Sequence, residues 1–214
     1  MTSGWVFEEA AIVFVSILAG IIFFYISSPS VKHEKKQQLE EGTSLIINFV
    51  LFIWAGKIVL NIHIFVTDPL AVLAYPSDAH AFYMAVLLLL VNIVYKATRK
   101  QMYVGTVLSA LVPIFLGSAF LYEFIEAVWN DNTMSWSHMG LLFILLILFL
   151  IRYEQIRPFT MTALIFTIWS LGQTILTFIL PYTTLYGYMM SLWFLILVFT
   201  ISLIALIYNK RKVT

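Results

Sequence analysis

The chain contains no cysteine and few charged residues. Lys, Arg, Asp and Glu together make up 11% of its 214 residues. The absence of cysteine excludes disulfides, thiolate metal sites and thiol redox chemistry. The scarcity of charge, together with 62% apolar residues, excludes an ordinary soluble domain, in which about a quarter of the residues are charged. The composition instead predicts an integral membrane protein, because a bilayer solvates apolar surface directly.

Long apolar runs fill most of the sequence. A helix needs roughly 20 apolar residues to cross the hydrocarbon core of a bilayer, and seven stretches reach or approach this length. They run approximately over Ala10–Ser27, Ser44–Val66, His80–Tyr95, Tyr103–Trp129, Trp136–Ile151, Phe159–Leu180 and Gly187–Tyr208. We therefore expect one polytopic domain over residues 1–214, an all-α bundle of seven transmembrane helices.

The basic residues are placed with a strong bias. Eleven of the 12 Lys and Arg residues fall into four clusters between or after apolar runs, and the remaining one, Lys57, lies inside a run. The clusters are Lys32, Lys35 and Lys36; Lys96, Arg99 and Lys100; Arg152 and Arg157; and Lys210, Arg211 and Lys212. By the positive-inside rule, all four lie in the cytoplasm. This predicts an outside N-terminus, a cytoplasmic C-terminus and an odd number of crossings. The short connections favour a bacterial cytoplasmic membrane as the cell membrane in question.

A weak internal similarity follows the first helix. The remaining six predicted helices form three hairpins of comparable length, and the outgoing helix of each contains a glycine followed by a polar or small residue. These glycines are Gly56, Gly117 and Gly172. Threefold duplication of a hairpin accounts for this pattern, but glycine is common in membrane helices in any case.

Polar residues recur at helical spacing on the second, fourth and sixth predicted helices. They are Lys57 and Asn61, Glu123 and Glu126, and Ser170 and Gln173. Each pair shares one helix face, and such a face is costly against lipid. We therefore expect the three faces to meet in a polar seam that binds a ligand, with Lys57 reaching Glu123 or Glu126. The alternative is that these groups only hold the helices together.

Three histidines offer a second candidate site. His63, His80 and His138 all map to the predicted outer ends of helices, where acidic residues are also found. Imidazole and carboxylate groups bind zinc or copper. None of the spacings matches a known ligand signature, so a metal site is the weaker interpretation.

No catalytic or cofactor motif is present. We therefore expect no catalytic residue and no cofactor, and the composition does not indicate binding to nucleic acid. The expected partners are the lipid bilayer and a small molecule whose identity the sequence does not reveal.

Three functional classes remain open. The first is a small transporter-like or ligand-binding membrane protein with an outward-facing polar cavity. The second is a non-catalytic subunit, assembly factor, sensor or immunity partner of another membrane protein. The third, and weakest, is an enzyme that modifies lipid in the outer leaflet, with Glu123 or Glu126 as general base. The low density of titratable groups favours the two classes without catalysis.

Overall fold

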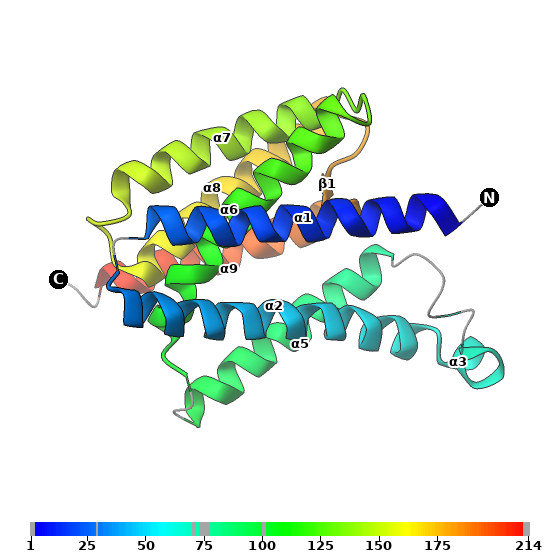
Figure 1. Cartoon of the computed structure of the whole chain (residues 1–214), viewed down its shortest axis with the longest axis horizontal. Coiled ribbons are helices and arrows are strands. Elements are labelled where there is room, and N and C mark those ends of the chain that lie inside the picture. The colour runs from blue at the N-terminus through cyan, green and yellow to red at the C-terminus, as the bar shows by residue number, and fades with distance from the viewer. Residues whose placement is uncertain (1–2, 29, 70–71, 73–77, 100–101, 212–214) are drawn as a thin grey trace.

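A computed structural model describes residues 3–28, 30–69, 72, 78–99 and 102–211. Of the basic residues used above, Lys100 and Lys212 lie outside these ranges. The described chain is almost entirely helical (Figure 1). The helices are α1 Ser3–Ser27, α2 Lys32–Leu60, α3 Ile62–Thr67, α5 Ala79–Thr98, α6 Val104–Val128, α7 Ser135–Arg152, α8 Pro158–Ile179 and α9 Leu192–Arg211, and the strands are β1 Thr184–Leu185 and β2 Tyr188–Met189.

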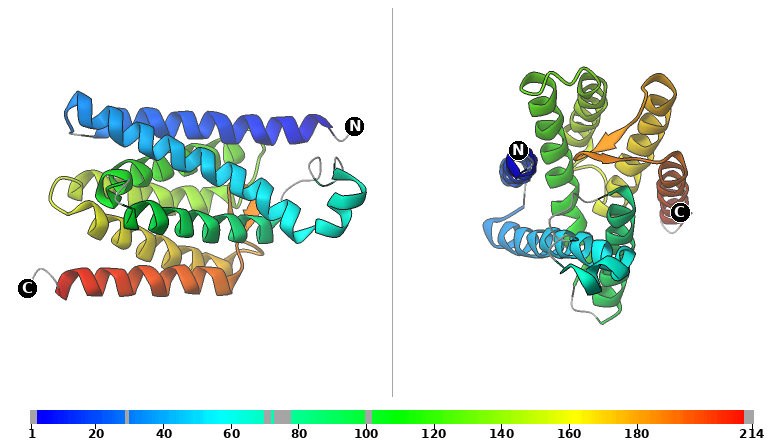
Figure 2. Two further views of the ribbon diagram at one scale, coloured as in Figure 1. Left: turned by 90° about the horizontal axis from the view of Figure 1, so that it is seen from below. Right: turned by 90° about the vertical axis from the view of Figure 1, so that its right-hand side faces the viewer.

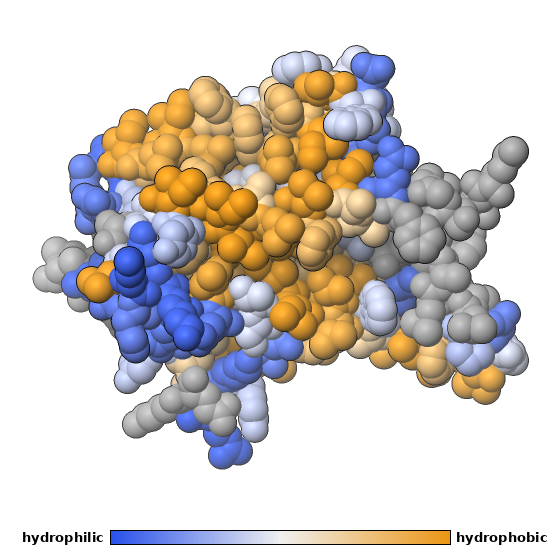
Figure 3. All heavy atoms as spheres, viewed as in Figure 1, coloured by the Kyte–Doolittle hydropathy of each residue, from blue (hydrophilic) through white to orange (hydrophobic). Residues whose placement is uncertain are grey.

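Seven of these helices are long and apolar enough to cross a membrane, as the sequence predicted. Many large apolar side chains are exposed along them, among them Phe14 at 63% and Ile144 at 62% exposed. A broad apolar band covers the face in view and separates hydrophilic residues at the two ends (Figure 3). Exposed apolar surface on this scale is unusual for a water-soluble monomer, and it is the surface expected of a multi-pass membrane protein.

Two helix boundaries differ from the sequence prediction. Helix α2 begins at Lys32 instead of near Ser44, because the polar stretch before the apolar run is rich in the good helix formers Glu, Lys and Gln. The same helix ends at Leu60, and Asn61 separates it from the short helix α3. Lys57 therefore lies in the last turn of α2, nearer to a helix end than a helix running to Val66 would place it.

Helix α6 is the centre of the bundle. In the most apolar stretch of α6, half of the residues are buried. In the other six long helices the buried share is 28% or less. It packs against α1, α2, α7 and α8, while α5 packs on α2 and α9 packs on α8. Seen from the end, α1 and α2 lie on one side of α6, and α8 and α9 lie on the other (Figure 2). The two faces of α6 thus look toward different neighbours.

Glycine makes the contact between α1 and α6 unusually close. A Cβ atom at Gly20 would collide with the backbone oxygen of Ile114, and it would come within 2.9 Å of the Ser118 Cβ atom. A Cβ atom at Gly117 would come within 3.2 Å of the Gly20 Cα atom. Small residues commonly permit this close approach of helix backbones in membrane proteins.

The three glycines of the weak internal similarity do not occupy equivalent contacts. Gly117 faces α1, whereas Gly56 approaches Ala81 and Met84 of α5, and Gly172 approaches Leu141 of α7. All three permit close packing, but one contacts the following helix of the chain and the others contact preceding helices. The shared glycines therefore reflect close packing and give no support to duplication.

The helices alternate in direction, so the basic clusters fall at one end of the bundle. The starts of α2 and α8 and the C-terminal end of α9 lie together at the left of Figure 1, and the N-terminus lies at the opposite end. We call these the basic end and the hairpin end, because the β1–β2 hairpin occupies the second.

The hairpin uses residues that we expected to begin the last helix. Thr184 pairs with Met189 and Leu185 pairs with Tyr188 in antiparallel register. The connecting residues Tyr186 and Gly187 have φ angles of +50° and +81°, as a two-residue type I′ turn requires. Helix α9 consequently begins at Leu192 instead of near Gly187.

The contact between α1 and α6 gives a direct test of the packing. We expect Gly20→Ala to lower the thermal midpoint of the purified protein, because overpacking of this kind costs about 1–3 kcal/mol. Tryptophan fluorescence during heating in detergent measures the midpoint. Gly140→Ala is the matched control, because a Cβ atom at Gly140 meets no described atom within 4 Å. Equal midpoints for the two variants would contradict the predicted close contact.

Candidate functional site

The structure divides the predicted polar seam into two groups. Because α6 lies between α2 and α8, the polar residues of α2 do not share a site with those of α8. Lys57 and Asn61 belong to the region between α2 and α5. Glu123 and Gln173 belong to the region between α6, α7 and α8.

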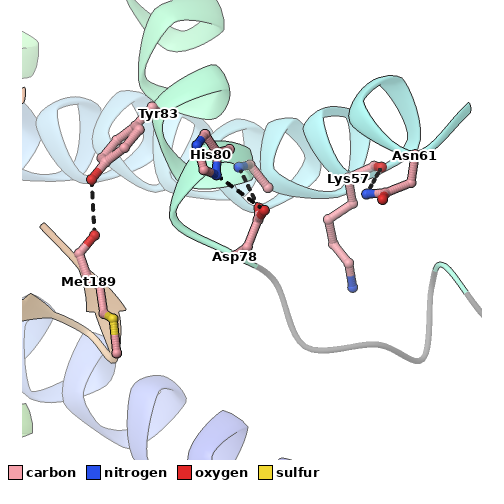
Figure 4. Close-up of polar contacts among 7 residues, drawn as sticks. Lys57, Asn61, Asp78, His80, Tyr83 and Met189 are labelled. Atoms are coloured by element: carbon pink, nitrogen blue, oxygen red, sulfur yellow. Dashed lines mark hydrogen bonds and ion pairs between the residues drawn. The ribbon is translucent and has the colours of Figure 1, made fainter. Parts of the chain in front are cut away.

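Lys57 is buried, with 7% of its surface exposed. Asp78, immediately before α5, interacts with it electrostatically. The Asn61 side-chain amide donates a hydrogen bond of 3.0 Å to the Lys57 backbone carbonyl, where α2 ends (Figure 4). Asn61 therefore satisfies a helix-terminal carbonyl and contributes to ending α2.

Asp78 links several groups at the hairpin end. Its carboxylate accepts a hydrogen bond of 2.9 Å from the Ala81 backbone N–H and so caps α5. The same carboxylate lies 3.4 Å from Nδ1 of His80, in a pair that is largely exposed (Figure 4). Neither ion pair described between side chains, Lys36–Glu40 or His80–Asp78, joins Lys57 to Glu123 or Glu126. The sequence prediction placed Lys57 beside these glutamates, and the structure gives it Asp78 as its acidic neighbour.

The three histidines of the metal interpretation are on three different helices. His63 is exposed on α3, His80 is largely exposed on α5, and His138 is 2% exposed on α7. Within the described part of the chain, no three His, Asp or Glu side chains come together in a way that could hold a metal ion.

Four buried side chains from α6, α7 and α8 form what we call the buried polar cluster. Its members are Glu123, Ser135, His138 and Gln173, each 1–2% exposed. The Ser135 side chain lies close enough to the Glu123 carboxyl group to interact with it, and the Gln173 side chain lies equally close to the His138 imidazole. Ser135 and His138 are three residues apart on α7, so their side chains lie about 5–6 Å apart on one face. This spacing connects the two pairs into one cluster.

The turn between α6 and α7 places the α7 residues. The Asn132 N–H donates a hydrogen bond of 3.0 Å to the Glu126 carbonyl, and the Met134 N–H donates one of 3.2 Å to the Asn132 side-chain oxygen. Asp131 adopts a left-handed conformation at φ +50°, which Asp tolerates better than most residues. The chain thus reverses within a few residues, and the first turn of α7 packs beside the last turns of α6.

Several polar atoms in and beside the buried polar cluster have no hydrogen-bond partner among the described residues. They are Oε2 of Glu123, Nδ1 of His138, Oε1 of Gln173 and Nε1 of Trp169. Trp169 precedes Gln173 by one helical turn and is 2% exposed. Each unsatisfied buried group costs about 1–3 kcal/mol, and native proteins contain few of them. A concentration of such atoms on neighbouring helices marks a place for water, a proton or a ligand.

The hairpin closes this region with a tyrosine. The hydroxyl groups of Tyr186 and Ser118 are 2.5 Å apart. Ser118 donates its single proton to the Ile114 carbonyl at 2.6 Å, so Tyr186 acts as the donor to Ser118. Burial raises the pKa of the Tyr186 phenol above its ordinary value, and the hydroxyl therefore keeps its proton at neutral pH.

A second tyrosine outside the cluster anchors the hairpin. The Tyr83 hydroxyl on α5 donates a hydrogen bond of 3.0 Å to the Met189 carbonyl (Figure 4). The same hydroxyl accepts a hydrogen bond of 2.8 Å from the Ser191 N–H. The Tyr186 ring meets the Tyr122 ring of α6 edge to face, with centroids 5.5 Å apart. The hairpin is thus fixed to both α5 and α6.

The surroundings of Glu123 are acidic. Glu126, on the same helix, interacts electrostatically with Glu123, and Glu9 of α1 interacts electrostatically with Glu126. The Glu126 carboxylate also accepts a hydrogen bond of 2.9 Å from the Asn130 side chain. No Lys or Arg occurs between residues 101 and 151 or between 158 and 209. The segments that build the cluster therefore supply no cationic side chain of their own, apart from protonated histidine.

The arrangement does not resemble an activated serine. A serine nucleophile requires a base, usually imidazole, within hydrogen-bonding reach of its hydroxyl. Here the side chain that interacts with Ser135 is the Glu123 carboxyl group, and the one that interacts with His138 is Gln173 on another helix. Ser170, the serine of the predicted seam, donates a hydrogen bond of 2.7 Å to the Phe166 carbonyl, which is a common way for serine to satisfy itself inside a membrane helix.

A groove of about 370 Å³ is present at the opposite end of the molecule. It is lined by Glu40, Glu41, Ser44, Lys96 and Met102. It lies at the basic end between α2 and α5, so it is not the outward-facing cavity that we expected beside Lys57 and the glutamates.

Comparison of the chain with protein-family models, with curated proteins and with solved structures finds no match. The functional argument therefore depends on the geometry of the chain itself.

Three residues of this region were not singled out by the sequence analysis. Ser135 and Trp169 are ordinary residues of helices in sequence terms, and only the packing of α6, α7 and α8 brings them to Glu123 and Gln173. Tyr186 itself carried no signal; its neighbour Gly187 did, because glycine readily adopts the positive φ that a two-residue hairpin turn requires. Hydropathy averages over a long window and does not detect such a turn.

The hydrogen bond between Tyr186 and Ser118 leads to a testable prediction. We expect Tyr186→Phe and Ser118→Ala each to lower the thermal midpoint, and the double variant to lower it by less than the sum. The difference between the sum of the two single effects and the effect of the double variant should correspond to about 0.5–1.5 kcal/mol, the usual net free energy of one hydrogen bond. Tyr182→Phe is the control, since Tyr182 is 43% exposed in the same connection. Strict additivity of the two changes would show that the hydroxyl groups do not interact.

Proposed function

We propose that this chain is a multi-pass membrane protein, of the transporter or ligand-binding type, that binds a small polar ligand at the buried polar cluster. The proposed site contains Glu123, His138 and Gln173, with Ser135 as a supporting residue. Lys57 and Asn61 are outside it. In this proposal the protein resides in a cell membrane, with the basic end in the cytoplasm and the hairpin end outside.

The observation that carries the proposal is the set of unpartnered polar atoms inside apolar helices. Polar groups that only hold helices together are expected to bond to one another, because a membrane offers no other partner. Here Glu123, His138 and Gln173 each keep an atom without a partner among the described residues. Ionisable residues inside membrane helices are also functional candidates by default. Ligand binding accounts for both features, whereas structural support accounts for neither.

The position of the cluster favours access from the hairpin end. Glu123 precedes the end of α6 at Val128 by five residues, and His138 follows the start of α7 at Ser135 by three. At the helical rise, these separations place the cluster about 5–8 Å inside the helix ends. Tyr186 of the hairpin packs against Tyr122, the residue before Glu123 on α6. A ligand would therefore enter beside the hairpin and not from the basic end.

The orientation of the chain in the membrane can be tested because the sequence has no cysteine. We introduce single cysteines at exposed positions of the two ends, Gln37→Cys at the basic end and Asp131→Cys at the hairpin end. Asp131→Cys should react with a membrane-impermeant maleimide in intact cells, because the positive-inside rule places this turn outside. Gln37→Cys should react only after permeabilisation. Labelling of both positions under the same condition would refute the proposed orientation.

Ligand binding can be tested with the purified protein in lipid nanodiscs. We expect at least one class of small polar solute, among cations, anions and neutral compounds, to raise the thermal midpoint, because a ligand that binds the native state stabilises it. The increase should be lost in Gln173→Leu and retained in Asn130→Ala, an exposed residue near the same end. If no class stabilises the wild-type protein, the proposal fails. Co-purification of one membrane protein in fixed ratio would then favour the partner role.

A further inference from the structure

The charges around the buried polar cluster bear on which ligand it can accept. This step rests on the proposed function and concerns the same site. Glu123 and His138 belong to the cluster, and the titratable groups linked to Glu123 by electrostatic interactions, directly or through Tyr122, are Glu126 and Tyr122 from α6, Glu9 from α1, and Tyr186 and Tyr188 from the hairpin. Helix α8 contributes the neutral amide of Gln173. Three of these groups are carboxyl groups, so the local field is negative when they ionise.

An anionic ligand does not fit these surroundings. Proteins bind carboxylates and phosphates with Arg, Lys or helix N-termini. The chain has no Lys or Arg between residues 101 and 151 or between 158 and 209. Lys57, the one lysine inside an apolar run of the sequence, interacts with Asp78 on the other side of α6. An anion at Glu123 would therefore meet repulsion from Glu123 and Glu126.

Two of the four unpartnered atoms, the oxygens of Glu123 and Gln173, can accept hydrogen bonds from a ligand, whereas the Trp169 indole N–H can only donate one. Glu123 keeps one carboxyl oxygen without a partner, and the Gln173 side-chain oxygen is likewise unpartnered. The faces of aromatic rings also attract cations. The rings of Tyr122 and Tyr186 have their centroids 5.5 Å apart, and both tyrosines interact electrostatically with Glu123. Carboxylate, carbonyl and aromatic groups together form the surroundings that proteins use to hold an ammonium group.

A divalent metal ion fits less well. Structural and catalytic metal sites use three or more protein ligands, and no three His, Asp or Glu side chains come together among the described residues. An ammonium ion is about the size of a water molecule and needs hydrogen-bond acceptors instead of a fixed coordination shell.

We propose that the buried polar cluster binds a small ammonium group, either the ammonium ion or a primary methylammonium, with Glu123 as its counter-charge and the Gln173 carbonyl as an acceptor. The aromatic rings of Tyr122 and Tyr186 form the remaining wall. Glu9 and Glu126 raise the local concentration of cations near the hairpin end.

The experiment uses the full chain in nanodiscs at constant pH and ionic strength. The thermal midpoint is measured against increasing ammonium chloride and methylammonium chloride, with sodium chloride and sodium acetate as matched salts. We expect both ammonium salts to raise the midpoint of the wild-type protein in a saturable manner, and neither sodium salt to do so. An equal response to sodium chloride would overturn the proposal, because the effect would then be ionic strength alone.

Variants assign the effect to the site. Glu123→Gln keeps the size of the side chain and removes its charge, so the apparent affinity for ammonium should fall about tenfold or more. Asp131→Asn, which changes an exposed carboxylate at the same end, should leave it unchanged. If Glu123→Gln does not fold, Glu126→Gln replaces it, with an expected loss of about two- to threefold, because a partly exposed charge acts more weakly. An unchanged affinity in the folded variant would overturn the proposal.

Other outcomes separate this inference from the proposed function. If acetate stabilises the protein and Gln173→Leu abolishes the effect, the site binds a ligand but the inference of a cation fails. If the midpoint depends on pH but equally so in ammonium and sodium salts, the cluster binds a proton and not an ammonium group. If no solute stabilises the protein at any pH, the proposed function fails as well.

Discussion

The close contact between α1 and α6 determines the environment of every polar residue on α6. Because Gly20 and Gly117 let the two backbones approach, α1 covers a face of α6 that would otherwise contact lipid. Helices α2, α7 and α8 also pack against α6. On this most enclosed of the long helices, Ser118, Tyr122 and Glu123 are little exposed. A charged residue on a peripheral helix would face hydrocarbon at a cost on the order of 2.5–3.5 kcal/mol.

Neighbouring helices pack against the sides of α6, and the β1–β2 hairpin packs near its C-terminal end. Its left-handed turn at Tyr186 and Gly187 points a phenol toward Ser118 of α6, and Tyr83 holds its other edge. These bonds satisfy backbone and side-chain groups that would otherwise be exposed near apolar surroundings. The hairpin is thus fixed to α5 and α6 at this end of the bundle, and its second strand uses residues for which hydropathy alone predicts helix.

The sequence predicted the apolar helices well, because hydropathy over a long window records burial in lipid directly. It predicted less about neighbours. Helical spacing shows that Lys57 and Asn61 share a face, and likewise Glu123 and Glu126, but it does not show which faces meet. Those neighbours depend on the order of helices around α6, which glycine contacts and loop geometry set together. The sequence therefore indicates Glu123, Gln173 and His138 as individual polar residues of apolar helices, but it does not indicate that Asp78, which precedes a different helix, interacts with Lys57.

The separation of Lys57 from the glutamates also decides the charge balance inside the bundle. Inside the apolar runs of the sequence the chain has one lysine, Lys57, and Asp78 acts on it at the α2–α5 side. Glu9 is exposed and Glu126 is half-buried, so water can solvate both carboxyl groups, whereas Glu123 is 2% exposed. A membrane interior stabilises charge poorly. On the proposal made above, a proton or a cation from the surrounding solution would compensate the charge of Glu123, and the state of the buried polar cluster would then depend on which of them the solution supplies.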